Sequence, residues 1–280
     1  MKTILITGIN GFIGSNLAKT LSASYHIIGL EYSSKNLSRL EGYNFQVYES
    51  ASHIPDEVFT RHKIDIIIHT ATFYGRNQEE VKTIAGANLF TPFELLDKAI
   101  AANVKLFINT DTVIDRFTSF YALSKNHFRE WLQMRSTQIK AVNLQLEHFY
   151  GPGCPSTNFI TLMIEKLKNN EPQIDLTPGL QVRDFIYYTD VLDAYKVVLD
   201  KWDTLAETFT NLQVASGNHV TIKELVEKIK EYTGSQSILK FGALPYRQNE
   251  LMNPDTNSSA LKALGWKAKV SINDGIKKTI

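Results

Sequence analysis

The glycines at positions 8, 11 and 14 place the strongest constraint on the fold of this chain. They follow an apolar, β-branched run at residues 3–7 and precede residues 15–21, whose apolar spacing is helical. In a strand, turn and helix of this kind, Gly8 permits the sharp turn, Gly11 lets an anion approach the backbone, and Gly14 lets the helix pack closely on the strand. The free amide groups at the start of the helix then face the anion. The sequence therefore predicts a βα unit that holds a pyrophosphate.

An acidic residue follows the next predicted strand, where dinucleotide-binding folds place a ribose ligand. Residues 26–30 are typical of a buried strand, which ends at Glu31, and the acid of such folds lies about 20 residues beyond the glycine turn. The alternative is a structural turn without a ligand, and the complete context of the motif argues against it. The residues predicted to bind the cofactor here are Gly8, Asn10, Gly11, Phe12, Ile13, Gly14 and Glu31.

Composition narrows the class of protein. A chain of 280 residues that is 43% hydrophobic is long enough for one large core or two lobes. A net charge of +1 gives no global field for nucleic acid or an anionic membrane. The single cysteine, Cys154, excludes internal disulfides and a thiolate metal cluster, and no apolar run is long enough for a membrane span or export signal. We expect a cytoplasmic α/β enzyme with no nucleic-acid or membrane partner.

Alternating segments predict the rest of the nucleotide-binding domain. Strands are expected at residues 45–48, 64–69, 104–109 and 143–149, and helices at 33–42, 56–62, 84–102 and from 121 to about 134. Strict alternation implies a doubly wound parallel Rossmann sheet. Ligands bind at the carboxyl ends of such strands, so Thr70, Ala71 and Thr72 should lie close to the cofactor. His69 is interpreted as a core histidine because no Cys or paired His lies at metal-ligand spacing, and no metal site is predicted.

Tyr121 and Lys125 are the candidate proton-transfer pair. Four residues apart on a helix, they share one face, so the ammonium could lower the pKa of the phenol and bind a ribose hydroxyl of the cofactor. The same spacing occurs by chance on many helical surfaces. After a nucleotide motif and a strand that ends near Thr112, it favours catalysis by Thr112, Tyr121 and Lys125.

The chain resembles the extended short-chain dehydrogenase/reductase family of sugar-nucleotide epimerases, dehydratases and reductases. The resemblance covers nearly the whole chain and rests on the glycine motif, the Tyr121/Lys125 pair, Asn88 and its flanking helix, and the segments 150–153, 183–185 and 264–266. It implies cofactor contacts from Asn88, Lys125 and Leu146, and a homodimer. Residues 73–76, 146–151, 179–185 and 247–252 further resemble the branch of CDP-abequose and CDP-paratose synthases, which reduce the 4-keto group of a CDP-3,6-dideoxyhexose.

The resemblance places the substrate mainly in the second half of the chain. Residues 151–155 break the chain so abruptly that we expect a Rossmann domain over 1–152, a returning segment near 184–214, and a smaller substrate-binding lobe over 153–280. Arg183 and Arg247, both expected in loops, have guanidinium groups suited to a pyrophosphate, although a surface ion pair is the alternative for each. The residues expected to bind the nucleotide sugar are Tyr74, Arg76, Glu147, His148, Asn158, Arg183 and Arg247.

The motifs and the resemblance together predict an NAD(P)H-dependent reductase of a 4-keto-6-deoxy or 4-keto-3,6-dideoxy nucleotide sugar. The resemblance implies that this substrate is preferably a CDP-sugar and that the enzyme acts in surface-polysaccharide synthesis. Alternatives are an epimerase or dehydratase, in which Asp111 would be the extra acid, and a cofactor-binding sensor without catalysis. Dehydratases of the family place an Asp-Glu pair after the threonine, where this chain has Val113 and Ile114. Glu31 favours NADH, whereas the resemblance favours NADPH, for which Lys35 and Arg39 could supply the charge.

Overall fold

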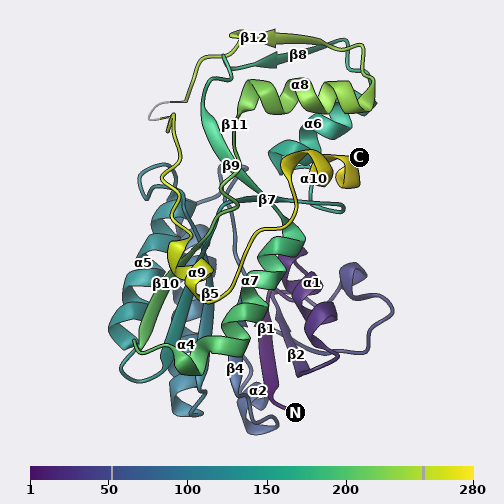
Figure 1. The fold of residues 1–280 in the computed structure, drawn as a ribbon. Helices are drawn as coiled ribbons and strands as arrows, with labels where there is room; N and C mark the ends of the chain where they lie inside the picture. Colours follow the sequence, from purple (N-terminus) through teal and green to yellow (C-terminus); the bar gives the residue numbers. More distant parts are fainter. Residues whose placement is uncertain (52, 248–249) are drawn as a thin grey trace. The chain divides into compact units, whose positions relative to one another are not determined.

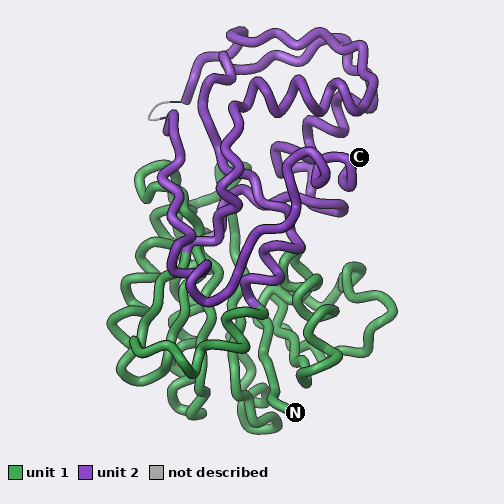
Figure 2. The backbone as a smooth tube through the Cα atoms, viewed as in Figure 1, with its two compact units in different colours: residues 1–145, 196–212 green, residues 146–195, 213–280 purple. Residues whose placement is uncertain are grey.

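The computed structural model describes residues 1–51, 53–247 and 250–280, which form two compact units (Figures 1 and 2). Unit 1 comprises Met1–Gln145 and Lys196–Leu212, and unit 2 comprises Leu146–Tyr195 and Gln213–Ile280. The chain therefore passes to unit 2 at residues 145–146, and the segment that returns to unit 1 is 196–212. That unit 1 binds the cofactor and unit 2 the substrate stays a prediction.

Unit 1 is built on a seven-stranded sheet in the order β10-β6-β5-β4-β1-β2-β3. Its strands are β1 (Thr3–Thr7), β2 (His26–Glu31), β3 (Gln46–Glu49), β4 (Ile66–His69), β5 (Leu106–Thr112), β6 (Lys140–Leu146) and β10 (Phe209–Val214). The strand β1 pairs in parallel with β2 and β4, which is the centre of a doubly wound sheet. The predicted Rossmann fold is confirmed.

Helices flank this sheet because each returns the chain to the start of the next parallel strand. They are α1 (Phe12–Leu21), η1 (Ser38–Leu40), α2 (Glu57–Thr60), α3 (Val81–Ala85), η2 (Gly86–Phe90), α4 (Thr91–Ala101), α5 (Phe120–Arg135) and η3 (Trp202–Thr204), and α7 (Tyr188–Lys201) joins the units. Strand residues such as Leu5, Ile67 and Phe107 pack with Leu95 of α4 and Phe128 of α5 in one apolar core. Figure 1 shows α4 and α5 beside the strands of this sheet.

Unit 2 contains two small sheets. Its strands are β7 (His148–Tyr150), β8 (Gln173–Leu176), β9 (Val182–Tyr187), β11 (His219–Thr221) and β12 (Ile238–Phe241), and its helices are α6 (Phe159–Lys168), α8 (Ile222–Thr233), α9 (Ser259–Ala263) and α10 (Ile272–Thr279). The sheets have the orders β11-β9-β7 and β12-β8. The helix α8 begins with a capping box, in which Thr221 and Glu224 satisfy each other's backbone amides.

Three predicted elements differ from the structure. Residues 33–42 contain only the short helix η1, because Asn36 and Ser34 use their side chains in local turns and in a bond to Glu49. The strand predicted at 143–149 is divided between β6 and β7, which belong to different sheets. The helix predicted at 84–102 begins at Val81 and passes through the π-helical turn η2 before α4.

Candidate functional site in the Rossmann unit

The glycine turn has the close packing that its motif predicts. Gly8 has a φ of +65°, and a Cβ added to Gly14 would lie 2.1 Å from the Gly8 carbonyl oxygen. Only glycine fits at either position, since one needs a left-handed backbone and the other a backbone contact. Ala71 also packs on Gly8, whose added Cβ would lie 2.8 Å from the Ala71 Cα. The structure thus brings the predicted cofactor residues of β1, α1 and β4 to one edge of the sheet.

Glu31 is held over this turn. One of its carboxylate oxygens, Oε2, accepts a hydrogen bond from the Asn10 amide at 2.8 Å, and the other accepts from the Tyr32 amide at 3.1 Å. The Asn10 side chain donates to the Asn36 carbonyl and accepts from the Arg39 amide, which ties residues 36–39 to the turn. The Arg39 guanidinium lies 5.8 Å from the centre of the Phe12 ring. A cradle without Cβ atoms and an acid at the end of β2 fit the phosphates and ribose of a dinucleotide.

The side chain of Asn88, which the resemblance assigns to the cofactor, forms hydrogen bonds within the protein. It is buried, its Oδ1 accepts from the Phe73 amide, and its Nδ2 donates to the Phe73 carbonyl and to Ser124 Oγ. The side chain therefore fixes residues 72–73 to α5 and uses its own hydrogen-bonding groups to do so. A direct cofactor contact by Asn88 stays a prediction that this geometry does not favour.

Thr112 lies near the Tyr121 phenol. Its side chain acts to lower the pKa of that phenol, and Thr112 is 6% exposed at the end of β5. The ring of Tyr121 lies 4.7 Å from that of Tyr74, and the Arg76 guanidinium lies 4.3 Å from the centre of the Tyr74 ring. These two predicted substrate residues are thus stacked beside the predicted acid.

The pKa of the Tyr121 phenol differs from the prediction. Burial of the hydroxyl, with Tyr74 and Asp111 nearby, raises this pKa well above its usual range, and the bonds and charges of Thr112 and Arg76 oppose this only in part. Lys125 is not among the groups that shift this pKa, and its predicted effect on the phenol stays a prediction. A phenol of this kind keeps its proton at neutral pH.

Lys125 is 2% exposed, and burial lowers the pKa of its ammonium to about 8, although Asp111 opposes the shift. The same lysine helps to lower the pKa of His69, which is 1% exposed, bonds to Thr7 Oγ1 at 2.7 Å and packs against Phe107 and Phe128. His69 therefore has the position of a core histidine. Within the described residues, no group of three His, Cys, Asp or Glu side chains could hold a metal ion.

The titration of Lys125 predicts an alkaline limit on activity. Because kcat/KM follows ionisations of the free enzyme, it should fall as the pH rises through about 8, where Lys125 loses its charge. Tyr121 titrates far above this range, so the limb belongs to the lysine. A pH profile of the Lys125→Arg variant, whose group stays charged, should lack the limb even if its rate is lower. An unchanged limb in that variant would assign the ionisation to another group.

Asp111, the acid that an epimerase or dehydratase would need, is bound within the protein. Its carboxylate accepts from Arg129 at 2.8 Å, from Asn143 at 2.9 Å and from the Thr112 amide at 2.8 Å, and it is 4% exposed. Because side chains alternate along a strand, Thr110 shares the face of Thr112, and it is the more exposed of the two.

The residues of unit 2 that were predicted to bind ligands differ in their exposure and in their hydrogen-bond partners. Arg183 lies on β9 rather than in a loop, and it pairs with Glu250 and donates to the Leu251 carbonyl at 2.5 Å. Arg247 is exposed, and Gln248 and Asn249 of the same motif lie outside the described residues. Asn158 caps α6 by accepting from the Ile160 amide and donates to the Phe149 carbonyl, and its contact with the substrate stays a prediction. Leu146 is buried at the end of β6.

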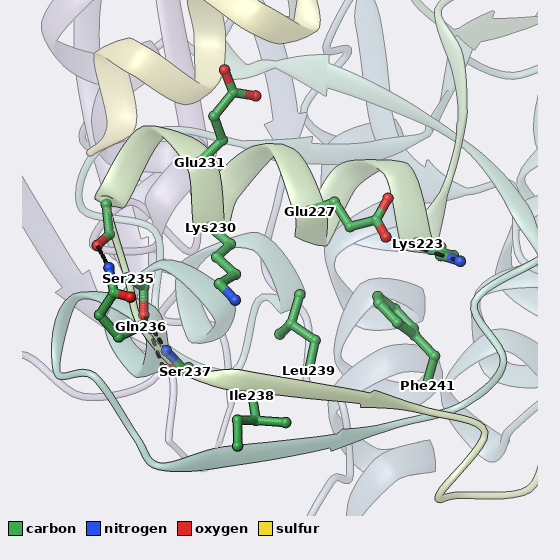
Figure 3. Close-up of a pocket in the computed structure, with 11 residues that line it drawn as sticks. Lys223, Glu227, Lys230, Glu231, Ser235, Gln236, Ser237, Ile238, Leu239 and Phe241 are labelled. Atoms are coloured by element: carbon green, nitrogen blue, oxygen red, sulfur yellow. Dashed lines mark hydrogen bonds and ion pairs between the residues drawn. The ribbon is translucent and has the colours of Figure 1, made fainter.

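Glu147 and His148 form an acid-base pair in unit 2, in which the acid is buried and the histidine is partly exposed. Their Oε2 and Nδ1 atoms are 3.4 Å apart, and Glu147 is 4% exposed. Burial raises the pKa of the Glu147 carboxyl, although His148 opposes the shift. Unit 2 also has a hollow between α8 and β12, in which Lys230 points from the helix toward the strand and Leu239 from the strand toward the helix (Figure 3). None of the predicted site residues lines this hollow.

Together, the parallel sheet, the glycine cradle, Glu31 and the helix that carries Tyr121 and the buried Lys125 are typical of a dinucleotide-binding Rossmann domain. The family model described as "NAD dependent epimerase/dehydratase family" matches residues 4–211. The chain belongs to this family. In the described residues, no helix is both long and apolar enough to cross a membrane.

Relatives extend over the whole chain. A CDP-abequose synthase of Salmonella muenchen is 33% identical over 100% of this chain and 97% of its own length. A human dTDP-D-glucose 4,6-dehydratase is 30% identical over 100% of this chain and 89% of its own. The UDP-glucose 4-epimerase of Thermotoga maritima, solved with UDP-glucose, has the same fold, with a TM-score of 0.87, 23% identity, and coverage of 99% and 97% of the two chains.

Proposed function

We propose that this protein is an NADH-dependent reductase of the 4-keto group of a 6-deoxy or 3,6-dideoxy nucleotide sugar, with a CDP-sugar as the preferred substrate. The similarity to CDP-abequose synthase supports the substrate class and a role in the synthesis of O-antigen sugars. One observation carries the reaction type. The carboxylate of Asp111 is committed to Arg129, Asn143 and the Thr112 amide, which leaves Tyr121 as the proton donor of the catalytic set.

The mechanism follows from what each side chain can do. A nicotinamide cofactor, when bound, supplies the hydride that reduces the carbonyl carbon. Tyr121 donates its proton to the carbonyl oxygen, and Thr112, whose side chain lies near the phenol, orients that oxygen. The Lys125 ammonium supports the phenolate that forms and binds the cofactor ribose. Gly8, Gly11 and Gly14 would hold the pyrophosphate, and Glu31 the ribose hydroxyls.

The rival is an epimerase or dehydratase with tightly held NAD, to which the human relative points. A dehydratase needs a further acid and base at the sugar, and this chain has Val113 and Ile114 after Thr112. Incubation with a panel of 4-keto nucleotide sugars distinguishes the two. We expect the absorbance of NADH at the reduced-nicotinamide band to fall in proportion to the keto sugar added. Conversion of a 4-hydroxy sugar without net consumption of NADH would favour the rival.

Cofactor choice is predicted by the setting of Glu31. Its Oε2 accepts from the Asn10 amide of the turn and its Oε1 from the adjacent Tyr32 amide, which places the carboxylate where it suits ribose hydroxyls and repels a 2′-phosphate. Ser34 is already bound to Glu49, and Arg39 packs over Phe12. We expect a higher kcat/KM with NADH than with NADPH and a shift toward NADPH in Glu31→Ala, with the exposed Glu41→Ala as the control. A clear NADPH preference in the unmodified protein would show that Lys35 or Arg39 selects the cofactor.

A second copy of the chain is the proposed partner. On α5, the spacing of Phe120, Trp131 and Met134 places them along one helical stripe, and they are 56%, 54% and 77% exposed. Phe90, on the adjoining turn η2, is also exposed, at 65%. Large apolar groups in such a row mark an interaction surface. We expect a dimer by light scattering and a monomer for Met134→Glu with Trp131→Glu; a dimer in both would place the interface elsewhere.

A further inference from the structure

A closed ring of hydrogen bonds surrounds the peptide groups of Thr112. We call it the amide ring; its members are the side chains of Asp111, Asn143, Asn211 and Gln145 and the backbone of Thr112. They lie on the adjacent strands β5, β6 and β10 of unit 1. Residues 111 on β5, 143 and 145 on β6, and 211 on β10 face each other across these strands, as their bonds show.

Each link of the ring has a defined length. Asn143 Nδ2 donates to Asp111 Oδ2 at 2.9 Å and to Asn211 Oδ1 at 2.7 Å. Asn211 Nδ2 donates to Gln145 Oε1 at 2.7 Å, and Gln145 Nε2 donates to the Thr112 carbonyl at 3.4 Å. The Thr112 amide closes the ring by donating to Asp111 Oδ1 at 2.8 Å. Both backbone groups of Thr112 are thus held by side chains of the same network.

The ring also reaches the helix that carries the catalytic pair. Arg129 of α5 donates to Asp111 at 2.8 Å and also bonds to the side chain of Asn126, the residue after Lys125. Asn126 in turn donates to the Ala122 carbonyl at 2.9 Å within the first turns of α5. The end of β5 and the start of α5 are therefore joined by polar contacts.

Two members of the amide ring are buried, so their hydrogen bonds matter for the stability of the ring. Asp111 and Asn143 are 4% and 0% exposed, and polar groups in such a setting are costly unless each finds partners of good geometry. The linked hydrogen bonds of the amide ring therefore restrict the conformations that its side chains can adopt. Apolar residues could have joined these strands without that constraint, so a polar ring at the end of β5 suggests that the conformation of this strand end matters.

We propose that the amide ring positions Thr112, so that its hydroxyl meets both Tyr121 and the substrate carbonyl, and that Asn143, Gln145 and Asn211 are positioning residues for the reaction. This inference rests on the proposed reductase function. The competing explanation is that the ring only stabilises the edge of the sheet. The two explanations differ in whether the effect of the ring passes through the Thr112 hydroxyl.

The test opens the ring at its exposed member. Asn211→Ala should lower kcat by roughly tenfold, because contacts within one network couple strongly and small misplacements of reacting groups are costly. It should leave the NADH dissociation constant and the melting temperature near their original values. Gln145→Ala should lower kcat by a similar factor. The double variant Asn211→Ala with Gln145→Ala should lose no more kcat than either single variant. Thr210→Ala is the matched control, because Thr210 lies on the opposite face of β10 from Asn211, and this variant should retain full turnover.

The decisive comparison is made in the Thr112→Val background. There, Asn211→Ala should change kcat by less than about twofold, since the hydroxyl that the ring positions is already absent. The same tenfold loss in that background, or full turnover in both single variants, would overturn the proposal. If the unmodified protein reduces no 4-keto sugar, the reductase function fails separately. In that case, hydrogen exchange of the Thr112 amide, measured by NMR, tests the amide ring separately. Faster exchange in Asn211→Ala supports the ring, and unchanged exchange contradicts it.

Discussion

Replacing Tyr121 with phenylalanine should lower kcat by about 10²- to 10⁴-fold, the contribution usual for a positioned general acid. The phenol lies near Thr112, and burial raises its pKa, so it is protonated at neutral pH. Removing one oxygen leaves the stacked contact of the ring with Tyr74 in place. Folding and cofactor binding should therefore persist while proton donation is lost.

The measurement is kcat at saturating substrate and cofactor, with NADH binding followed by fluorescence as a separate check. Tyr43→Phe, at an exposed tyrosine of the same unit, provides the control for loss of a phenol. Turnover close to that of the unmodified protein in Tyr121→Phe would show that another group supplies the proton. Thr110 is then the first residue to test, because it lies on the same face of β5 as Thr112.

Removing either arginine of the proposed diphosphate clamp should raise the substrate KM more than it changes cofactor affinity. A charge-assisted hydrogen bond is worth about 1.5–3 kcal/mol, or about 10- to 150-fold. Arg183 and Arg247 test this differently. Arg247 is exposed, so Arg247→Ala should fold normally and report on binding alone. Arg183→Ala also leaves Glu250 without its ion-pair partner, so part of its effect could be structural.

The combined variant Arg183→Ala with Glu250→Gln separates these effects. If Arg183 binds the diphosphate, the KM of the combined variant stays high although the unpaired charge is gone. Lys240→Ala, at an exposed cation on β12, is the matched control for loss of positive charge in unit 2. A substrate KM that is unchanged in both arginine variants would remove the clamp from the mechanism.

Local sequence signals were sufficient for the sheet and for the glycine turn. The run at Thr3–Thr7 and the alternation of strands with helices fixed the parallel order, because few connections join parallel strands. The turn was predictable because Gly8 and Gly14 have no workable substitute: one requires a positive φ and the other a close backbone contact. Helix spacing likewise placed Tyr121 and Lys125 on one helix, α5.

Features that depend on distant partners could not be predicted. Residues 33–42 have a helical pattern, but bonds from Asn10 and Glu49 hold them in turns. Arg183 looked like a loop cation, although pairing with β11 makes it part of β9. The raised pKa of Tyr121 and the amide ring depend on burial and on three strands that meet only in the folded chain.

The fate of a labelled hydride tests the central claim most directly. The protein would be incubated with NADH that carries deuterium at the transferable position and a CDP-4-keto-3,6-dideoxyhexose, and the product examined by NMR. A 4-ketoreductase places deuterium at C4 of the product, gives a 4-hydroxyl group, and consumes one NADH for each sugar reduced. Deuterium absent from C4, or product formed without consumption of NADH, would contradict the account.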